Sequence, residues 1–348
     1  MTARVGIVKD ERYLGHMPGH THPEHPLRLK TVYRMVEKEF SDDLVSIEPE
    51  PATLEQLEFV HSTVYIQKVM KTADHDFTSL APDTPASAGT YLASWLAAGG
   101  CIKGLDAMVL DVCDICFALI RPPGHHALAD RAAGFCVFNN LGITARYAMK
   151  VHQMSRILIV DWDVHHGNGL NDLFYAEREV LYLSTHDTGL YPYSGEWVET
   201  GKGPGEGYTI NIPIPRTLTD DDFCALYRGI LAPVITGYSP ELILVAAGFD
   251  AHRDDPIGRC RLTEKAFGVL TRLLLDLRLH IPVPPVLFAL EGGYDPRSLS
   301  RSVREVLMAM SGRQASEMFP AGASGRAEEL IGKARRIHDR YGIWTDVR

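Results

Sequence analysis

The sequence has few cysteines, no excess of positive charge and no long hydrophobic run, and each shortage excludes a class of protein. Six cysteines are spread over 348 residues, too sparsely for a disulfide-stabilised scaffold, so we expect reduced thiols. Acidic residues outnumber basic ones by 44 to 35, giving a formal net charge of −9, which argues against direct binding to nucleic acid. The apolar stretch at the N-terminus is too short for a signal peptide or a membrane span. We therefore expect a cytoplasmic protein.

One Cys-x-x-Cys pair is present, at Cys113 and Cys116. Such a pair is redox-active or metal-binding in some proteins, but a structural zinc site needs a second pair, which this sequence lacks. Free cysteines are usually buried. We expect both to be small apolar residues at the start of a strand.

No repeat, low-complexity tract or linker divides the chain. Hydrophobic residues make up 45% and charged residues 23%, as in globular proteins with a substantial core. Because α/β folds often exceed 200 residues as one unit, residues 1–348 are expected to form a single domain. Charged and apolar residues alternate at helical spacing in 325–348, which predicts a C-terminal amphipathic helix.

Short apolar runs alternate with helix-like stretches. Runs rich in Val, Ile and Leu predict buried parallel strands at 116–120, 157–160, 180–183, 242–245 and 286–290. Helical patterns supply the crossovers that parallel strands require, at 138–150, 220–236, 263–279 and 298–310. The predicted fold class is α/β, with a doubly wound, mainly parallel sheet and helices on both faces.

Polar side chains gather directly after these strands, where doubly wound sheets bind their ligands. They are His125, His126, Asp161, Asp163, His165, Ser184, Thr185, Asp250 and Tyr294. Since alternate residues of an extended segment face the same side, Asp161, Asp163 and His165 point to one place. Together with Asp250 they suit a catalytic zinc ion, whereas an isolated Asp-x-Asp-x-His is as often a set of helix caps or arginine partners.

Two further features suggest proton transfer. His125 and His126 follow a Pro-Pro-Gly turn, and two adjacent imidazoles would be hard to satisfy in a core, so we expect them in an active site. Tyr294 follows two glycines and has a hydroxyl able to donate to an oxyanion. A lone tyrosine after two glycines is more often structural.

Five motifs occur together in this order: R-P-P-G-H-H-A, G-F-C-x-F-N-N, D-x-D-x-H-H-G-N-G, G-F-D-A and L-E-G-G-Y. With them the sequence resembles the histone deacetylase-like zinc amidohydrolases, which have the arginase-deacetylase fold. The resemblance spans roughly residues 22–310. A dozen matched positions are far more specific than any single motif.

The resemblance implies one Zn²⁺ per chain, bound by Asp163, His165 and Asp250. It implies that His126 is the general base and then the general acid, and that His125 supports it through Asp161. Tyr294 would donate to the oxyanion. Asn168 would lie behind His126, where some branches carry aspartate; a neutral partner raises the pKa of the imidazole less than a carboxylate does.

The resemblance also implies a substrate channel and a structural potassium ion. Asp83 would hold the substrate backbone at the rim, Gly134, Phe135 and Tyr191 would form the channel walls, and Arg28 would line a product-release cavity. The implied K⁺ ligands are Asp161, Asp163, His165, Ser184 and Thr185.

Ile257 occupies the position of an acidic gatekeeper in one polyamine-specific branch. An apolar residue there cannot pair with a second ammonium group, which favours N-acyl-lysine in a protein or peptide as the substrate. A small acylated amine such as an acetylpolyamine stays an alternative. Two other functions fit the motifs less well. One is an inactive module that binds acyl-lysine or a partner protein, and the other is a two-manganese arginase-like hydrolase. The sequence leaves the oligomeric state open.

Overall fold

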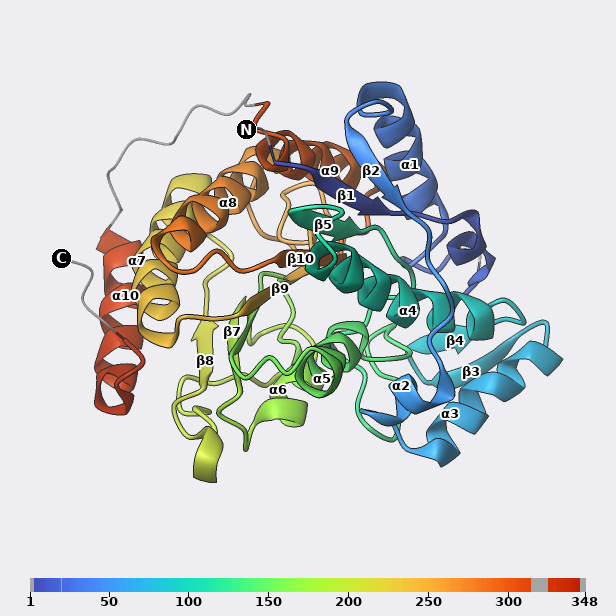
Figure 1. Cartoon of the computed structure of the whole chain (residues 1–348), viewed down its shortest axis with the longest axis horizontal. Helices are drawn as coiled ribbons and strands as arrows, with labels where there is room; N and C mark the ends of the chain where they lie inside the picture. Colours follow the sequence, from blue (N-terminus) through green and yellow to red (C-terminus); the bar gives the residue numbers. More distant parts are fainter. Residues whose placement is uncertain (1–2, 20, 314–324, 345–348) are drawn as a thin grey trace.

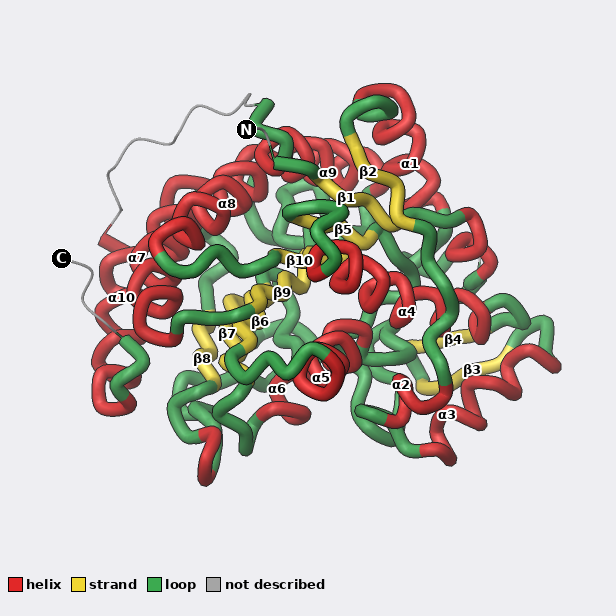
Figure 2. The backbone as a smooth tube through the Cα atoms, in the orientation of Figure 1, coloured by secondary structure: helices red, strands yellow, loops and turns green. Residues whose placement is uncertain are grey.

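The computed structural model describes residues 3–19, 21–313 and 325–344, and a parallel eight-stranded sheet forms its centre (Figures 1 and 2). The strand order is β2-β1-β5-β10-β9-β6-β7-β8. The strands are β1 (Val5–Val8), β2 (Leu44–Ile47), β5 (Ile115–Ala118), β6 (Ile157–Asp161), β7 (Val180–His186), β8 (Thr209–Pro213), β9 (Leu242–Ala247) and β10 (Val286–Leu290). A separate antiparallel pair joins β3 (Thr78–Ala81) to β4 (Thr84–Ala86).

The five predicted strands are confirmed as β5, β6, β7, β9 and β10, every residue of which is buried. The apolar runs within them follow from this position, since helices cover both faces of a parallel sheet, while β6 and β7 end in polar residues at the carboxyl edge. Strands β1, β2 and β8 were not predicted. Strands β2 and β8 lie at the two edges of the sheet, and β2 is only partly buried, so its apolar pattern is weak.

Helices pack on both faces of the sheet, as predicted (Figure 1). The helices α1 (Leu27–Glu39), α7 (Asp220–Tyr238), α8 (Glu264–Leu277) and α9 (Pro296–Met310) cover one face. The other face carries α4 (Thr90–Val109), α5 (Asn140–Val151) and α6 (Asn168–Phe174). The short helices α2 (Leu54–Glu58) and α3 (Thr63–Met70) lie near the antiparallel pair.

The predicted helices are confirmed, with ends set by capping side chains. The helix predicted from residue 138 begins at Asn140, because the Asn139 side chain accepts from the Gly142 amide and caps the helix. The helix predicted from residue 298 begins two residues earlier, after the cap Asp295.

The C-terminal helix is shorter than predicted. α10 (Gly325–His338) is followed by a single 3₁₀ turn, and Gly342 then adopts a left-handed conformation with φ of 70°, which ends helices. Residues 345–348 of the predicted helix lie outside the described residues. α10 packs on α7, where Ile331 fits against Gly229.

Cys113 and Cys116 are buried beside the start of β5, as predicted, and all six cysteines are free thiols. No helix in the described part of the chain combines the length and apolarity needed to cross a membrane.

Candidate active site

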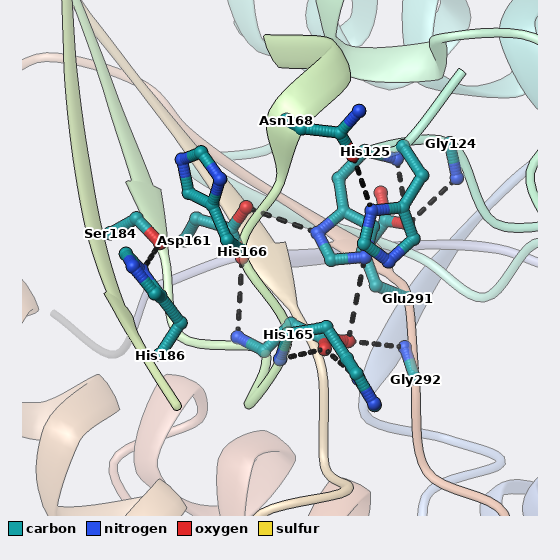
Figure 3. A network of polar contacts seen from close by, with 12 residues as sticks. Gly124, His125, Asp161, His165, His166, Asn168, Ser184, His186, Glu291 and Gly292 are labelled. Atoms are coloured by element: carbon teal, nitrogen blue, oxygen red, sulfur yellow. Dashed lines mark hydrogen bonds and ion pairs between the residues drawn. The ribbon is translucent and has the colours of Figure 1, made fainter. Parts of the chain in front are cut away.

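Polar side chains from several strand ends meet at the carboxyl edge of the sheet (Figure 3). The strands β5, β10, β9, β6 and β7 are consecutive neighbours in the sheet and run parallel, so the segments that follow them lie side by side. The predicted grouping of strand-end residues is therefore what the topology produces.

Asp163, His165 and Asp250 form a buried cluster at this edge. The Nδ1 atom of His165 lies 3.0 Å from Asp163 Oδ1 and 2.9 Å from Asp250 Oδ2. One potential ligand atom from each residue lies within 4.8 Å of the others. The remaining carboxylate oxygens accept from main-chain amides, Asp163 Oδ2 from Gly292 and Asp250 Oδ1 from Val164, which fixes their orientation.

Glycine is required beside this cluster because the backbone approaches it closely. A Cβ atom at Gly248 would lie 2.1 Å from Asp163 Oδ2, and one at Gly292 would lie 2.2 Å from Asp250 Oδ2. Both distances are far below van der Waals contact. The glycines of the G-F-D-A and L-E-G-G-Y motifs thus make room for the carboxylates.

The electrostatics of the cluster favour a bound cation. Burial, together with the nearby charge of Asp163, raises the pKa of Asp250 to about 7. Burial opposes ionisation of Asp163, but His125 and His165 outweigh it and lower its pKa. Two buried carboxylates and an imidazole are a donor set that zinc takes in catalytic sites. The residues present therefore fit a zinc ion.

Two histidines, His125 and His126, lie next to the cluster and have different hydrogen-bond partners. His125 Nδ1 lies 3.1 Å from Asp161 Oδ2, whereas His126 Nδ1 lies 2.8 Å from Asn168 Oδ1. The two rings lie against each other at a centroid distance of 4.0 Å and an interplanar angle of 44°.

The different partners move the pKa values of the two imidazoles apart. Burial lowers the pKa of His125, but the charges of Asp161 and Asp163 outweigh burial and raise it to about 10. Burial and the neighbouring His125 and His165 lower the pKa of His126 well below its usual value. Neighbouring groups with diverging pKa values are typical of acid–base catalysis.

Asp161 anchors the region behind His125. Its Oδ2 atom also accepts from the Tyr182 hydroxyl at 2.9 Å, and its Oδ1 atom accepts from the Asp163 amide. Asp161 pairs with Ser184 across β6 and β7. The predicted potassium ligands on these strands are therefore neighbours, although the Thr185 hydroxyl bonds to Tyr227 at 2.7 Å.

The predicted channel residues lie around His126. Asp83 Oδ2 accepts from the Gly134 amide at 3.1 Å, and the Tyr191 ring lies 5.0 Å from the His126 ring. The Phe135 ring meets the Tyr294 ring edge-on at 5.7 Å. A Cβ atom at Gly134 would lie 2.2 Å from His126 Cδ2, and φ there is 54°. The close approach and the left-handed backbone both require glycine.

Tyr294 is tied to the loop that carries Ile257. Asp255 accepts from the Tyr294 amide at 2.6 Å through Oδ2 and from the Ile257 amide at 2.8 Å through Oδ1. Burial raises the pKa of Tyr294 well above its usual value, so the phenol is a neutral donor. Ile257 itself is half-buried.

A buried ionic group around Arg28 was missed. Glu24 pairs with Arg28 Nη1 at 2.7 Å and with Arg121 Nε and Nη2, both at 2.6 Å. Arg28 also donates to the carbonyls of Gly293 and Glu291 at 2.5 Å. Arg121 begins the R-P-P-G-H-H-A motif, but its pairing with Glu24 across 97 residues leaves no signal in one sequence.

Glu291 was also missed, although it follows β10 directly. Its Oε2 atom accepts from the amides of Gly124 at 2.7 Å and His125 at 3.1 Å, and so holds the histidine turn. Burial raises the pKa of Glu291 to about 7.

The profile of the Histone deacetylase domain matches residues 22–310. The chain belongs to the histone deacetylase family. It is 34% identical to a probable deacetylase of Archaeoglobus fulgidus, over 97% of this chain and 98% of that protein. It is 37% identical to the chloroplastic histone deacetylase 14 of Arabidopsis thaliana, over 82% of this chain and 72% of that protein.

A solved structure of the same family shares the fold. The crystal structure of the HDA15 HD domain matches with a TM-score of 0.90 and 31% identity, over 98% of this chain and 97% of that chain. The chain is thus a histone deacetylase-family hydrolase with the arginase-deacetylase fold, and the resemblance inferred from the motifs is confirmed.

Proposed function

We propose that the protein is a zinc-dependent deacylase that hydrolyses the amide of N-acyl-lysine in proteins or peptides. The observation that carries the proposal is the buried Asp163–His165–Asp250 cluster beside two histidines with opposite pKa shifts. Residues 1–348 would act as one catalytic domain, and we place the activity in the cytoplasm, where the six free thiols stay reduced.

Asp163, His165 and Asp250 would hold one Zn²⁺. When bound, zinc supplies Lewis-acid polarisation of the amide carbonyl and makes a water more acidic. We further assign a structural K⁺ to Asp161, Asp163, His165, Ser184 and Thr185, supported by the adjacency of Asp161 and Ser184 on neighbouring strands.

His126 would move the proton. Its Nδ1–H donates to Asn168 Oδ1 at 2.8 Å, which leaves Nε2 as the acceptor. Because its pKa is depressed, the ring is neutral and able to take the proton of the attacking water at Nε2. The same atom then returns the proton to the nitrogen of the leaving amine.

His125 and Tyr294 would stabilise the charge that develops on the carbonyl oxygen. With a pKa of about 10, His125 stays cationic against Asp161. The Tyr294 phenol remains protonated and donates a hydrogen bond to the oxyanion. Asp83 would accept from the substrate backbone, while Gly134, Phe135 and Tyr191 enclose the acyl-lysine side chain.

Arg28 would line the route by which the carboxylate product leaves. Its charge is shared with Glu24, and its guanidinium lies 4.9 Å from the Tyr294 ring centre. A cation would then lie directly behind the proposed oxyanion donor.

A panel of amides tests the proposal. We would compare kcat/KM of the zinc-loaded protein on acetyl-lysine peptides, longer acyl-lysine peptides and acetylated polyamines, with Tyr294→Phe as control. Preference for a lysine peptide, lost in the variant, is the expected result. Preference for polyamines would leave the proposed mechanism standing but show that the substrate is an acetylated polyamine. No turnover of any amide would refute the proposed enzymatic activity and favour a binding module.

A further inference from the structure

A surface hollow of about 860 Å³ lies at the amino-terminal edge of the sheet, opposite the candidate active site. Arg4, Asp114 and Pro285 line it, and each directly precedes one of the neighbouring strands β1, β5 and β10. The hollow therefore sits below the middle of the sheet, a full strand length from the residues assigned to hydrolysis.

The walls of the hollow are largely apolar. They include Ala3, Met108, Val109, Met154, Val283, Pro284 and Pro285. Exposed aliphatic side chains also flank the lining residues in sequence: Leu110 and Val112 follow Val109, and Leu279 precedes Val283. Apolar surface gathered around a hollow is typical of a binding site.

Arg278 lines this hollow and is buried, with 7% of its surface exposed. Its hydrogen bonds run through Nη1, to the carbonyls of Pro284 at 3.1 Å and Asp114 at 3.4 Å. Its buried Nε atom has no partner, and the hydrogen bonds that Arg278 makes to other described residues leave Nη2 unused. The Nε–Nη2 edge of a guanidinium is the edge that binds a carboxylate through two parallel hydrogen bonds.

The two carboxylates near the hollow, those of Asp111 and Asp114, are paired with Arg4 and not with Arg278. Arg4 donates to Asp114 Oδ1 at 2.8 Å and also pairs with Asp111, and within the described ranges no ion pair joins either carboxylate to Arg278. Burial lowers the pKa of Arg278, and Asp114 only partly offsets this. A buried cation without a hydrogen-bonded counter-ion is costly, and an anionic ligand would relieve that cost.

We propose that this hollow binds an aliphatic monocarboxylate, with the carboxylate on the unpaired Nε–Nη2 edge of Arg278 and the alkyl chain against the apolar walls. The exposed carboxylate of Asp111 at the same hollow disfavours a dianion such as phosphate. The site is separate from the hydrolytic one, and the inference does not depend on the proposed function.

Calorimetric titration with octanoate, octanol and inorganic phosphate tests the proposal on the full-length protein. Octanoate should bind, and octanol and phosphate should bind at least about tenfold more weakly, because the charged hydrogen bonds and the apolar contacts are both needed. Equal binding of octanol, equal binding of phosphate, or no binding of octanoate would overturn it.

Two sets of variants locate the bound octanoate. Arg278→Lys keeps the charge but removes the planar edge, and should weaken octanoate binding about tenfold or more. Val283 is 56% exposed, so Val283→Glu and its neutral match Val283→Gln should both fold. Val283→Glu should weaken binding about tenfold by charge repulsion and Val283→Gln much less. Octanoate binding that is indifferent to Val283→Glu would overturn the assignment, even if Arg278→Lys does not fold.

Discussion

Replacing Asn168 with aspartate adds a negative charge behind His126 with little change of shape. Asn168 Oδ1 accepts from His126 Nδ1 at 2.8 Å, so the new carboxylate would lie about 4 Å from the centre of the imidazolium charge. Such a pair interacts by about 4 kcal/mol at an effective dielectric constant of about 20, equivalent to about three pKa units. Because Asn168 is only half-buried and solvent screens the charge, we expect the pKa of His126 to rise by about one to two units.

The acidic limb of the pH profile reports this change. His126 acts as a base only when neutral, so a higher pKa means that activity appears at higher pH. The limb of kcat/KM against pH should therefore move up by about one to two units in Asn168→Asp. Asn168→Ala, which removes the hydrogen bond without adding charge, should not move it upward. An unmoved limb in Asn168→Asp, at equal zinc content, would refute His126 as the general base.

Three further substitutions probe the packing of the site. Gly134→Ala should lower kcat/KM by about a hundredfold, because its Cβ displaces His126. Gly332→Ala on α10, whose Cβ would meet only the end of the Arg336 side chain at an ordinary 3.4 Å, should leave peptide hydrolysis unchanged. Glu24→Gln should lower the free energy of unfolding in urea by about 3–5 kcal/mol at neutral pH. Since the pKa of Glu24 is depressed on folding, mainly by Arg121 against the opposing effect of burial, the difference should shrink as the pH falls below about 4; a constant difference would contradict the ion-pair account. Gly292→Ala should weaken zinc binding, measured by competition with a chelator, and unchanged affinity would place the metal elsewhere.

The sequence predicted the parts of the fold that repeat a strong local pattern. The central strands carry apolar runs because both faces are covered, as in β9 and in β6 up to Asp161, and the residues that follow these runs carry the predicted cluster. The edge strand β2 was missed because it is short and partly exposed, which leaves little periodicity. The edge strand β8 is buried, but its Thr-Ile-Asn-Ile-Pro sequence mixes polar and apolar residues and so lacks the apolar run that marks the central strands. Helix starts differed by one or two residues where a cap such as Asn139 or Asp295 sets the boundary.

The candidate site was predicted where chemistry-bearing residues follow a strand, and missed where pairing is long-range. Asp163, His165 and Asp250 carry a recognisable donor set. Glu24 and Arg121 are ordinary charged residues until folding buries them together. The hollow around Arg278 is likewise formed by segments far apart in the chain, so no local sequence pattern predicts it.

The central claim is that a single zinc ion in the Asp163–His165–Asp250 cluster is required for amide hydrolysis. The most direct test removes metal with a chelator and measures hydrolysis of an acetyl-lysine peptide as zinc is added back. We predict no activity in the metal-free protein and a linear rise that reaches its plateau at about one zinc per chain. Full activity without metal, or no activity at any zinc content, would contradict the account.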